Sequence, residues 1–451
     1  MGLEIGIEWL TLIMFGSLIA LLMAGLPLAF VTGGLACVFL FVLGDARALN
    51  IVPSRIFPLM TNYQLSAIPL FIFMAAMLER AGIINEMFDV IYKLLGSLKG
   101  GLAAATILAS TILAAMVGVI GAAVVTMGII ALPAMLKRAY DPQIAMGSIM
   151  AGGTLGILIP PSILAIIYAV VAEQSVGELF VGAVFPGLLL SGMYVLYVVV
   201  RSYLNPSLGP PIPPGERVTP REKVLLLGNM SAPIALIVIV LGVIFTGIAT
   251  PVEAAGIGTF GAFIVAAIHR RLDWRTIREA SLTTLKASAM VIWIMFGATI
   301  FVGLYVLEGG QDFVEGALAA TGFGPWGILI VMMVVLVILG MFLDWVGILL
   351  LAVPIFVPIV RGMGPEAFGL SSTDDLVLWF GVLYLVNMQM SFLSPPFGYA
   401  LFYLRGVAPP EIPMTSIFKA ALPFLFLQIV GLGLCMAFPQ IITWLPGLVY
   451  G

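Results

Sequence analysis

The chain has 451 residues, of which 62% are hydrophobic and only 9% are charged, and its formal net charge is −3. A water-soluble fold of this size needs more charge on its surface, so the composition excludes a soluble protein. Long apolar runs without the alternation of barrel strands predict a polytopic all-α membrane protein whose surroundings are the lipid bilayer. No basic tract points to a nucleic-acid partner.

Eight segments are predicted to cross the membrane as simple helices, because each is apolar over about 20 residues. They cover about residues 8–24, 26–44, 65–81 and 180–203 in the first half, and about 225–246, 251–269, 284–307 and 424–444 in the second.

Two further apolar segments, about residues 101–136 and 326–360, are too long for a single crossing. Each covers about 35 residues, against roughly 20 for one membrane helix. Polar or small residues stand near their middles: Gly118, Gly121 and Thr126 in the first, and Gly340, Asp344 and Gly347 in the second. Both segments are therefore predicted to be re-entrant hairpins, whose tips are buried in the protein or line a cavity.

Paired prolines interrupt two more apolar segments, at about 143–172 and 376–405. The pair Pro160–Pro161 follows the sequence GGTLGILI, and the pair Pro395–Pro396 follows NMQMSFLS. Proline lacks a backbone donor and clashes with the preceding turn, so each helix is predicted to break here and leave carbonyl groups unpaired.

The same features occur in the same order twice, which indicates an internal repeat. A hairpin, a helix broken at Pro-Pro and a closing span follow one another in both halves, and PPSILAIIY at Pro160–Tyr168 matches PPFGYALFY at Pro395–Tyr403. An odd number of crossings per repeat turns the second copy upside down in the membrane. We therefore predict a first inverted repeat over residues 1–204, a linker over 205–224 and a second inverted repeat over 225–451.

The distribution of charge predicts the orientation. Acidic residues mark one side of the membrane, at the N-terminus and at Glu308, Asp312 and Glu315; basic residues mark the other, at Lys93, Lys99, Lys137, Arg138, Arg201, Arg221, Lys223 and in the loop 270–278. Basic loops stay in the cytoplasm, so both termini are predicted to face outward. Arg47 and Arg55, in an outward loop, are exceptions.

Inverted repeats with opposed hairpins and broken helices place a binding site near the middle of the membrane. Helix N-termini there offer amides to an anion, and unwound carbonyls and hydroxyls can hold a sodium ion. The candidate oxygen ligands are Thr126, Thr154, Ser162, Asn387, Ser391, Ser394 and the intramembrane carboxylate Asp344, and the glycines and prolines at the tips and breaks complete the site. We expect sodium at Thr126, Thr154, Asp344, Ser391 and Ser394, and no other cofactor.

Each of these residue types also has an ordinary structural explanation. A Ser or Thr hydroxyl inside a span often bonds back to its own helix. For Asp344 the alternatives are a structural ion pair or a position at the water interface.

Three motifs resemble the large membrane subunit of TRAP transporters, the tripartite ATP-independent periplasmic transporters: GGTLGILIPPS, GMFLDWVGILLLAVPIFVPIV and NMQMSFLSPPFGYALFYLRGVAPP. The likeness runs from about Gly25 to the C-terminus. It implies a sodium-driven elevator importer in the bacterial inner membrane. It also implies two partners, namely a small four-helix membrane subunit and a periplasmic binding protein that delivers an organic acid.

The chain departs from that family at the first hairpin tip. Many relatives carry a Ser-Gly-Ser-type sequence there, followed by an acidic residue, whereas this chain has Val117-Gly118-Val119 and then Ala123. Backbone carbonyls and Thr126 would then do more of the sodium binding in the first repeat. The sequences GGTLGILIPPS and SFLSPPFGYALFY are most similar to those of the family branch that is associated with monocarboxylates such as 2-oxo acids.

Other functions fit the sequence less well. A stand-alone sodium–carboxylate symporter of similar architecture, which needs no binding protein, is the alternative within transport. An ion channel would need a repeated selectivity motif or a continuous polar helix face, and neither is evident. An intramembrane enzyme would need a Ser/His or His/Asp/Glu cluster at membrane depth, yet the single histidine, His269, stands beside Arg270 at a span end. The chain carries no P-loop for ATP hydrolysis, and we expect no enzyme activity.

Overall fold

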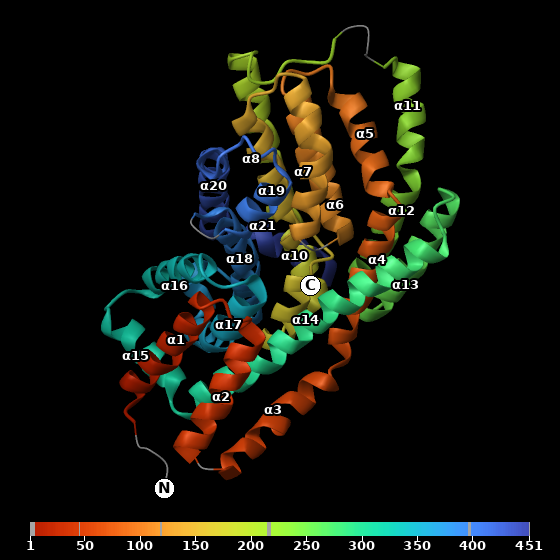
Figure 1. The fold of residues 1–451 in the computed structure, drawn as a ribbon. Coiled ribbons are helices and arrows are strands. Elements are labelled where there is room, and N and C mark those ends of the chain that lie inside the picture. The colour runs from red at the N-terminus through yellow and green to blue at the C-terminus, as the bar shows by residue number, and fades with distance from the viewer. Residues whose placement is uncertain (1–4, 45, 118–119, 214–217, 396–397, 451) are drawn as a thin grey trace.

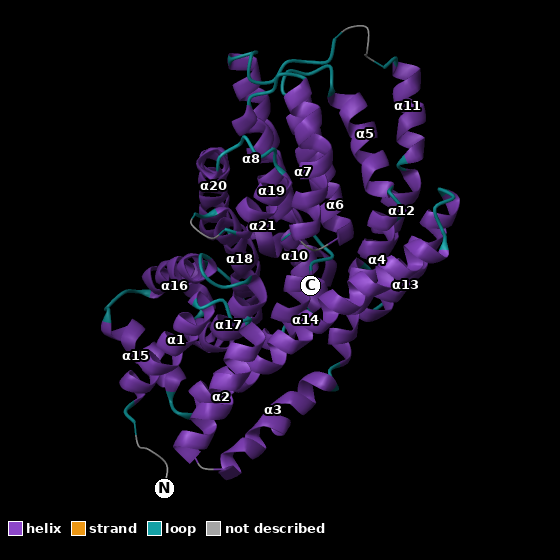
Figure 2. Cartoon of the chain, viewed as in Figure 1, coloured by secondary structure: helices purple, strands orange, loops and turns teal. Residues whose placement is uncertain are grey.

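The computed structural model describes residues 5–44, 46–117, 120–213, 218–395 and 398–450. Over these residues the chain forms helices joined by turns and loops, with no strand (Figure 2). Six helices are long and apolar enough to cross a membrane, or up to eight if two bent pairs each count as one span. The predicted all-α membrane fold is therefore confirmed.

One group of helices forms what we call the frame. It consists of α1 (Ile7–Met23), α2 (Leu28–Gly44), α4 (Ala67–Arg80), α12 (Ser231–Phe245), α13 (Pro251–Ile268) and α14 (Trp274–Leu307). The 34-residue helix α14 runs obliquely across the molecule and packs on α2 and α4, while α13 packs on α4 and α12 (Figure 1).

The remaining large helices form what we call the inner body, and they occur in the same order twice. The first set is α6 (Gly101–Val117), α7 (Ile120–Lys137), α8 (Pro142–Thr154), α9 (Ile163–Ala172) and α10 (Val176–Leu204). The second set is α16 (Pro325–Gly340), α17 (Trp345–Gly362), α18 (Thr373–Leu393), α19 (Tyr399–Val407) and α20 (Met414–Ala437). In each set the first two helices correspond to a predicted hairpin and the next two to a predicted broken helix. The sets interlock, because α8 packs on α20 and α18 packs on α10.

Local sequence explains where the broken helices start and stop. Asp141 caps α8, accepting hydrogen bonds from the amides of Gln143 and Ile144, and Pro142 occupies the first turn, where a missing N–H costs nothing. After the break, Ser162 caps α9 through the amide of Ala165. The second broken helix, α18, ends at Leu393, just before the second proline pair. Pro160 and Pro161 thus lie between α8 and α9, and Pro395 follows the end of α18, as predicted.

Several short helices were not predicted: α3 (Ile51–Met60), α5 (Ile83–Leu95), α11 (Pro220–Asn229), α15 (Gly310–Ala320) and α21 (Gln440–Tyr450). The expected span at 424–444 was placed wrongly. Helix α20 begins at Met414 and ends at Ala437, and α21 starts only at Gln440. Pro439 explains the interruption, since the residue before a proline is pushed out of the helical region, and Phe438 has φ −126° and ψ 80°. The division into residues 1–204, 205–224 and 225–451 stays a prediction.

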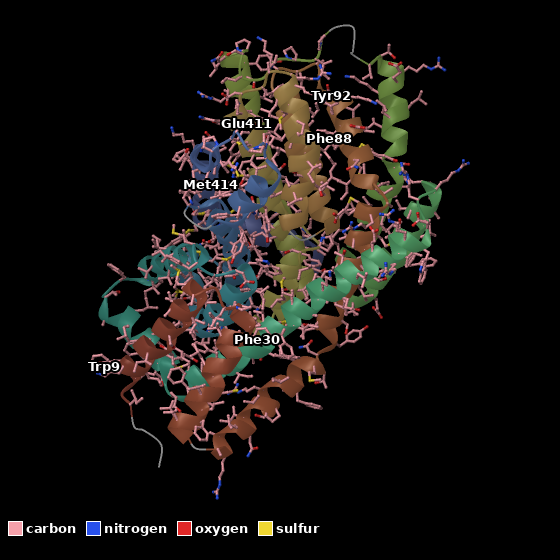
Figure 3. The ribbon with its side chains drawn as sticks, in the orientation of Figure 1. Trp9, Phe30, Phe88, Tyr92, Glu411 and Met414 are labelled. Atoms are coloured by element: carbon pink, nitrogen blue, oxygen red, sulfur yellow. The ribbon has the colours of Figure 1, made fainter. Side chains whose placement is uncertain are left out.

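The outer surface of the frame is apolar. Trp9 on α1 is 65% exposed and Phe30 on α2 is 63% exposed, and both carry large hydrophobic side chains (Figure 3). Such side chains face lipid at low cost, which agrees with a membrane environment.

The predicted orientation can be tested directly. The ends of α5, α7 and α10 and the start of α11 gather at one end of the molecule, at the upper edge of Figure 1; we call this the basic end. These helix ends carry Lys93, Lys137, Arg201, Arg221 and Lys223. Labels introduced at Pro213 and Arg275 should react only from the cytoplasm, and a label at Gln311 only from outside, because basic loops are retained inside. Reaction of Pro213 and Gln311 from the same face would contradict the inverted arrangement.

Candidate functional site

The tip of the second hairpin carries Asp344 directly in front of α17. Its carboxylate accepts a hydrogen bond from the backbone amide of Gly347 at 3.1 Å and so caps the helix N-terminus. A helix start carries partial positive charge and unpaired amides, which stabilise a carboxylate. The partner of Asp344 is thus a helix start and not a Lys or Arg side chain. The predicted site residue Gly347 contributes its backbone amide to this contact.

Asp344 also faces a small cavity between the inner body and the frame, which we call the central cavity. Its volume is about 190 Å³, enough for a small organic molecule. The inner body contributes Gly121, Ile163, Asp344, Trp345, Phe392, Tyr399 and Tyr403, and the frame contributes Ile72, Ala287, Met290 and Val291. Of the predicted site residues, Gly121 and Asp344, one from each hairpin, meet at this cavity.

Three helices begin at the central cavity. Their first residues, Ile163 of α9, Trp345 of α17 and Tyr399 of α19, all line it. The start of α9 is capped by Ser162 and that of α17 by Asp344, while no side chain caps α19. Converging helix N-termini supply amide donors and positive potential without a charged side chain, which suits an anionic ligand.

A second group of predicted residues lies on α18, beside the second hairpin. Asn387 donates a hydrogen bond to the carbonyl of Met333 at 2.8 Å, and its Oδ1 has no partner among the described residues. Ser391 packs against Gly340, and its buried Oγ is likewise unpartnered within the described structure. Oxygen atoms of this kind are the ligands that hard cations prefer. Asn387 and Ser391 therefore fit a sodium ion by the chemistry of their free oxygens.

Two other predicted hydroxyls have local structural roles. Ser394 Oγ donates to the carbonyl of Met390 at 2.7 Å, which is the bond back to its own helix. Ser162 Oγ bonds the carbonyl of Ile157 in addition to capping α9. The loop with Pro160 and Pro161 lies between Ile157 and Ser162.

Thr154 and Thr126 lie in different surroundings. Thr154 is fully buried at the end of α8; its hydroxyl accepts from Gln428 Nε2 at 3.3 Å and lies 3.5 Å from Gln389 Oε1. Thr126 lines a separate, charged cavity nearer the basic end and does not join the other candidates. Pro395 follows Ser394 and is half-buried. Gly118 and Pro396 lie outside the described residues.

Sequence reasoning missed the glutamines that meet Thr154. Gln389 and Gln428 are fully buried, and Gln389 Nε2 and Gln428 Oε1 lack partners within the described residues. Gln428 is the one polar residue in the apolar run FLFLQIV of α20, and a lone amide in such a run was the available signal. Tyr399 and Tyr403 stand inside the quoted motif PPFGYALFY but were not named as site residues.

Comparisons with known proteins identify the family. The model of the family described as "Tripartite ATP-independent periplasmic transporter, DctM component" matches residues 15–441. The C4-dicarboxylate TRAP transporter large permease protein DctM of Pseudomonas aeruginosa is 32% identical over 416 residues, which cover 92% of each chain. The isethionate TRAP transporter permease protein DctMQ of Oleidesulfovibrio alaskensis is 30% identical over 96% of this chain and 66% of its own length.

A solved structure supports the fold. The Alcanivorax borkumensis YdaH transporter, whose crystal structure was described as having an unusual topology, superimposes with a TM-score of 0.64 over 95% of this chain and 99% of its own. The sequence identity is 13%, so this likeness concerns the fold alone.

Packing at the second hairpin gives a testable prediction. A methyl group on Gly340 would overlap Cβ and Oγ of Ser391, so Gly340→Ala should lower the free energy of unfolding by about 1–3 kcal/mol. Gly316 of α15 is the matched control, because nothing lies within 4 Å of a Cβ added there. Thermal unfolding of both purified variants measures the difference. Equal stability of the two variants would show that α16 and α18 are not in contact here.

Proposed function

The chain belongs to the DctM family of tripartite ATP-independent periplasmic transporters, and from this premise we propose that it is the large membrane subunit of a sodium-coupled importer of a small organic acid. The observation that carries the proposal is the convergence of three helix N-termini on the central cavity. Amides at helix starts bind carboxylates without a formal charge, and the central cavity has room for a small acid.

The carboxylate of Asp344 supports the coupling to a cation. A carboxylate ligand in the central cavity would lie near Asp344, and two like charges in a weakly polar interior repel each other strongly. A bound sodium ion would supply the balancing positive charge. Asn387 and Ser391 would hold it through their free oxygens, and Asp344 would contribute through its charge. Binding of the acid would then favour binding of sodium, and the reverse, which is the thermodynamic basis of symport.

The arrangement of frame and inner body supports an elevator movement. Both hairpins and both broken helices belong to the inner body, while α4 and α14 of the frame close the central cavity from one side. Sliding of the inner body along α4 and α14 would expose the cavity to one side of the membrane at a time. Alternating access of this kind keeps the binding site intact.

Two partners are proposed for the chain in the bacterial inner membrane. The relative called DctMQ is longer than this chain, and its name indicates that a second membrane component is joined to the large permease there. We infer a separate small membrane subunit for this chain and a soluble periplasmic protein that delivers the acid.

Uptake into proteoliposomes tests the proposed function. Radiolabelled succinate and pyruvate serve as probes, with and without an inward sodium gradient, and with and without the cognate binding protein. Accumulation should require both the sodium gradient and the binding protein. Uptake without any binding protein would instead favour the stand-alone symporter, and uptake driven by a proton gradient alone would contradict sodium coupling.

Asp344→Asn separates the charge of this residue from its role as a cap. Asn caps helices about as well as Asp, so folding and expression should stay near normal. The loss of the negative charge should raise the sodium concentration for half-maximal uptake several-fold. Asp344→Ala, which also removes the cap, should in addition lower stability by about 1 kcal/mol. An unaltered sodium dependence in Asp344→Asn would restrict the residue to a structural role.

A further inference from the structure

A second cavity, which we call the basic-end cavity, lies between the frame and the first hairpin. It has a volume of about 520 Å³. The end of α4, the start of α14 and Arg271 in the turn before α14 supply its charged residues, and Thr126, Ile129 and Ile130 of α7 form the opposite wall. Three arginines and two glutamates line it, and Arg271 pairs with Glu86 of α5 at 4.0 Å.

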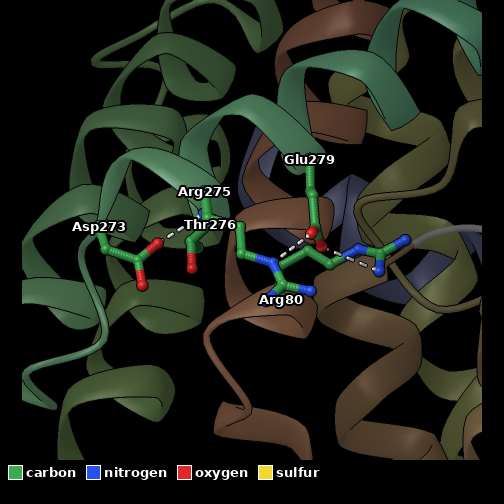
Figure 4. Close-up of polar contacts among 5 residues, drawn as sticks. All are labelled: Arg80, Asp273, Arg275, Thr276 and Glu279. Carbon is green, nitrogen blue, oxygen red and sulfur yellow. Dashed lines mark hydrogen bonds and ion pairs between the residues drawn. The ribbon is translucent and has the colours of Figure 1, made fainter.

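One carboxylate in this cavity is shared by two arginines. Glu279 Oε1 accepts from Arg275 Nε at 2.8 Å, and Glu279 Oε2 lies 3.4 Å from Arg80 Nη1 (Figure 4). The nearby Asp273 is engaged elsewhere, because it accepts from the amide of Thr276 at 2.6 Å and caps α14. Among the described residues, the two terminal nitrogens of Arg275 contact no acceptor, and its side chain is 87% exposed. A guanidinium with free terminal nitrogens is suited to a carboxylate.

The basic-end cavity and the central cavity are lined by the same three helices. Helix α4 contributes Ile72 to the central cavity and Glu79 to the other; α14 contributes Ala287 and Glu279, and α7 contributes Gly121 and Thr126. With a rise of 1.5 Å per helical residue, the second cavity lies roughly 10 Å from the first along these helices, toward the basic end. A ligand that leaves the central cavity toward the cytoplasm would follow these helices to the arginines.

We propose that the basic-end cavity is a second binding site for a carboxylate, used when the transported acid is released. The ligand class rests on the proposed function, whereas the anion preference of the cavity rests on its own residues. Arg80 and Arg275 bind the leaving carboxylate, and Glu279 competes with it for both. The competition keeps binding weak, and a release site must bind strongly enough to attract an anion but weakly enough to let it go.

Cysteine labelling of the full-length chain in lipid nanodiscs tests this site without any need for transport. Cys37 and Cys435 are replaced by Ser, and Ile129, an exposed residue of the cavity wall, by Cys. The rate at which this cysteine is labelled is measured with a negatively charged and with a positively charged methanethiosulfonate reagent of similar size. The quantity compared between variants is the ratio of the negative to the positive rate. Arg80→Gln and Arg275→Gln should each lower the negative-to-positive ratio by roughly threefold or more at low salt, and Glu279→Gln should raise it.

Control variants distinguish a specific carboxylate site from a general effect of surface charge on the labelling rate. Arg278→Gln removes the same charge from the same helix, but Arg278 does not line the cavity, so the ratio should not change. Arg275→Lys keeps the charge and should keep most of the ratio. In the Ile129→Cys protein without further substitutions, succinate should slow labelling by a neutral reagent more than chloride does at equal ionic strength. Arg275→Gln should abolish this protection by succinate. An equal effect of Arg278→Gln, or no protection by succinate, would overturn the proposal, even if sodium-driven uptake is found.

Discussion

The structure depends on one constraint: every backbone amide and carbonyl in the middle of a membrane needs a partner inside the protein, because lipid offers none. Three helices begin at the central cavity. Asp344 and Ser162 accept hydrogen bonds from amides at the starts of α17 and α9, and no side chain caps the start of α19. The start of α19 is therefore available to a ligand in the central cavity.

The same constraint bears on how the proposed ion site can function with so few charges. Helix starts act as partial positive charges, and free amide or hydroxyl oxygens act as cation ligands. The proposed ion site in the inner body therefore needs a single carboxylate, where a soluble protein would use several charged side chains. Asp344 is tolerated in these apolar surroundings because it caps the start of α17 and accepts a hydrogen bond from the amide of Gly347. The ion pairs that the structure describes, such as Arg275 with Glu279, involve residues of α4, α5 and α14 and of the turn between α13 and α14.

The sequence was sufficient for features that depend on chain length and on proline, and insufficient for features that depend on three-dimensional contacts. Apolar runs too long for one helix predicted both hairpins, and proline pairs predicted both breaks. Short helices such as α3 and α21 were missed because their runs are too brief to separate from loops. Thr126 was grouped with Thr154 by residue type, but Thr126 on α7 lines the basic-end cavity, whereas Thr154 on α8 is buried against Gln428. The meeting of Gln389 and Gln428 at Thr154 joins residues far apart in the chain, which no local pattern encodes.

That meeting links the two sets of helices of the inner body to each other. Thr154 of the first repeat lies between Gln389 and Gln428 of the second, and all three side chains are fully buried. Tyr168 of α9 likewise donates to the carbonyl of Val377 in α18. Separating the two sets of helices would leave the amide of Gln428 and the hydroxyl of Tyr168 without these partners in an apolar interior, which costs free energy. A displacement of the inner body against the frame would therefore preserve the distances between the helix ends at the central cavity. In the proposed movement, the boundary that shifts is the one between frame and inner body, along which both cavities lie.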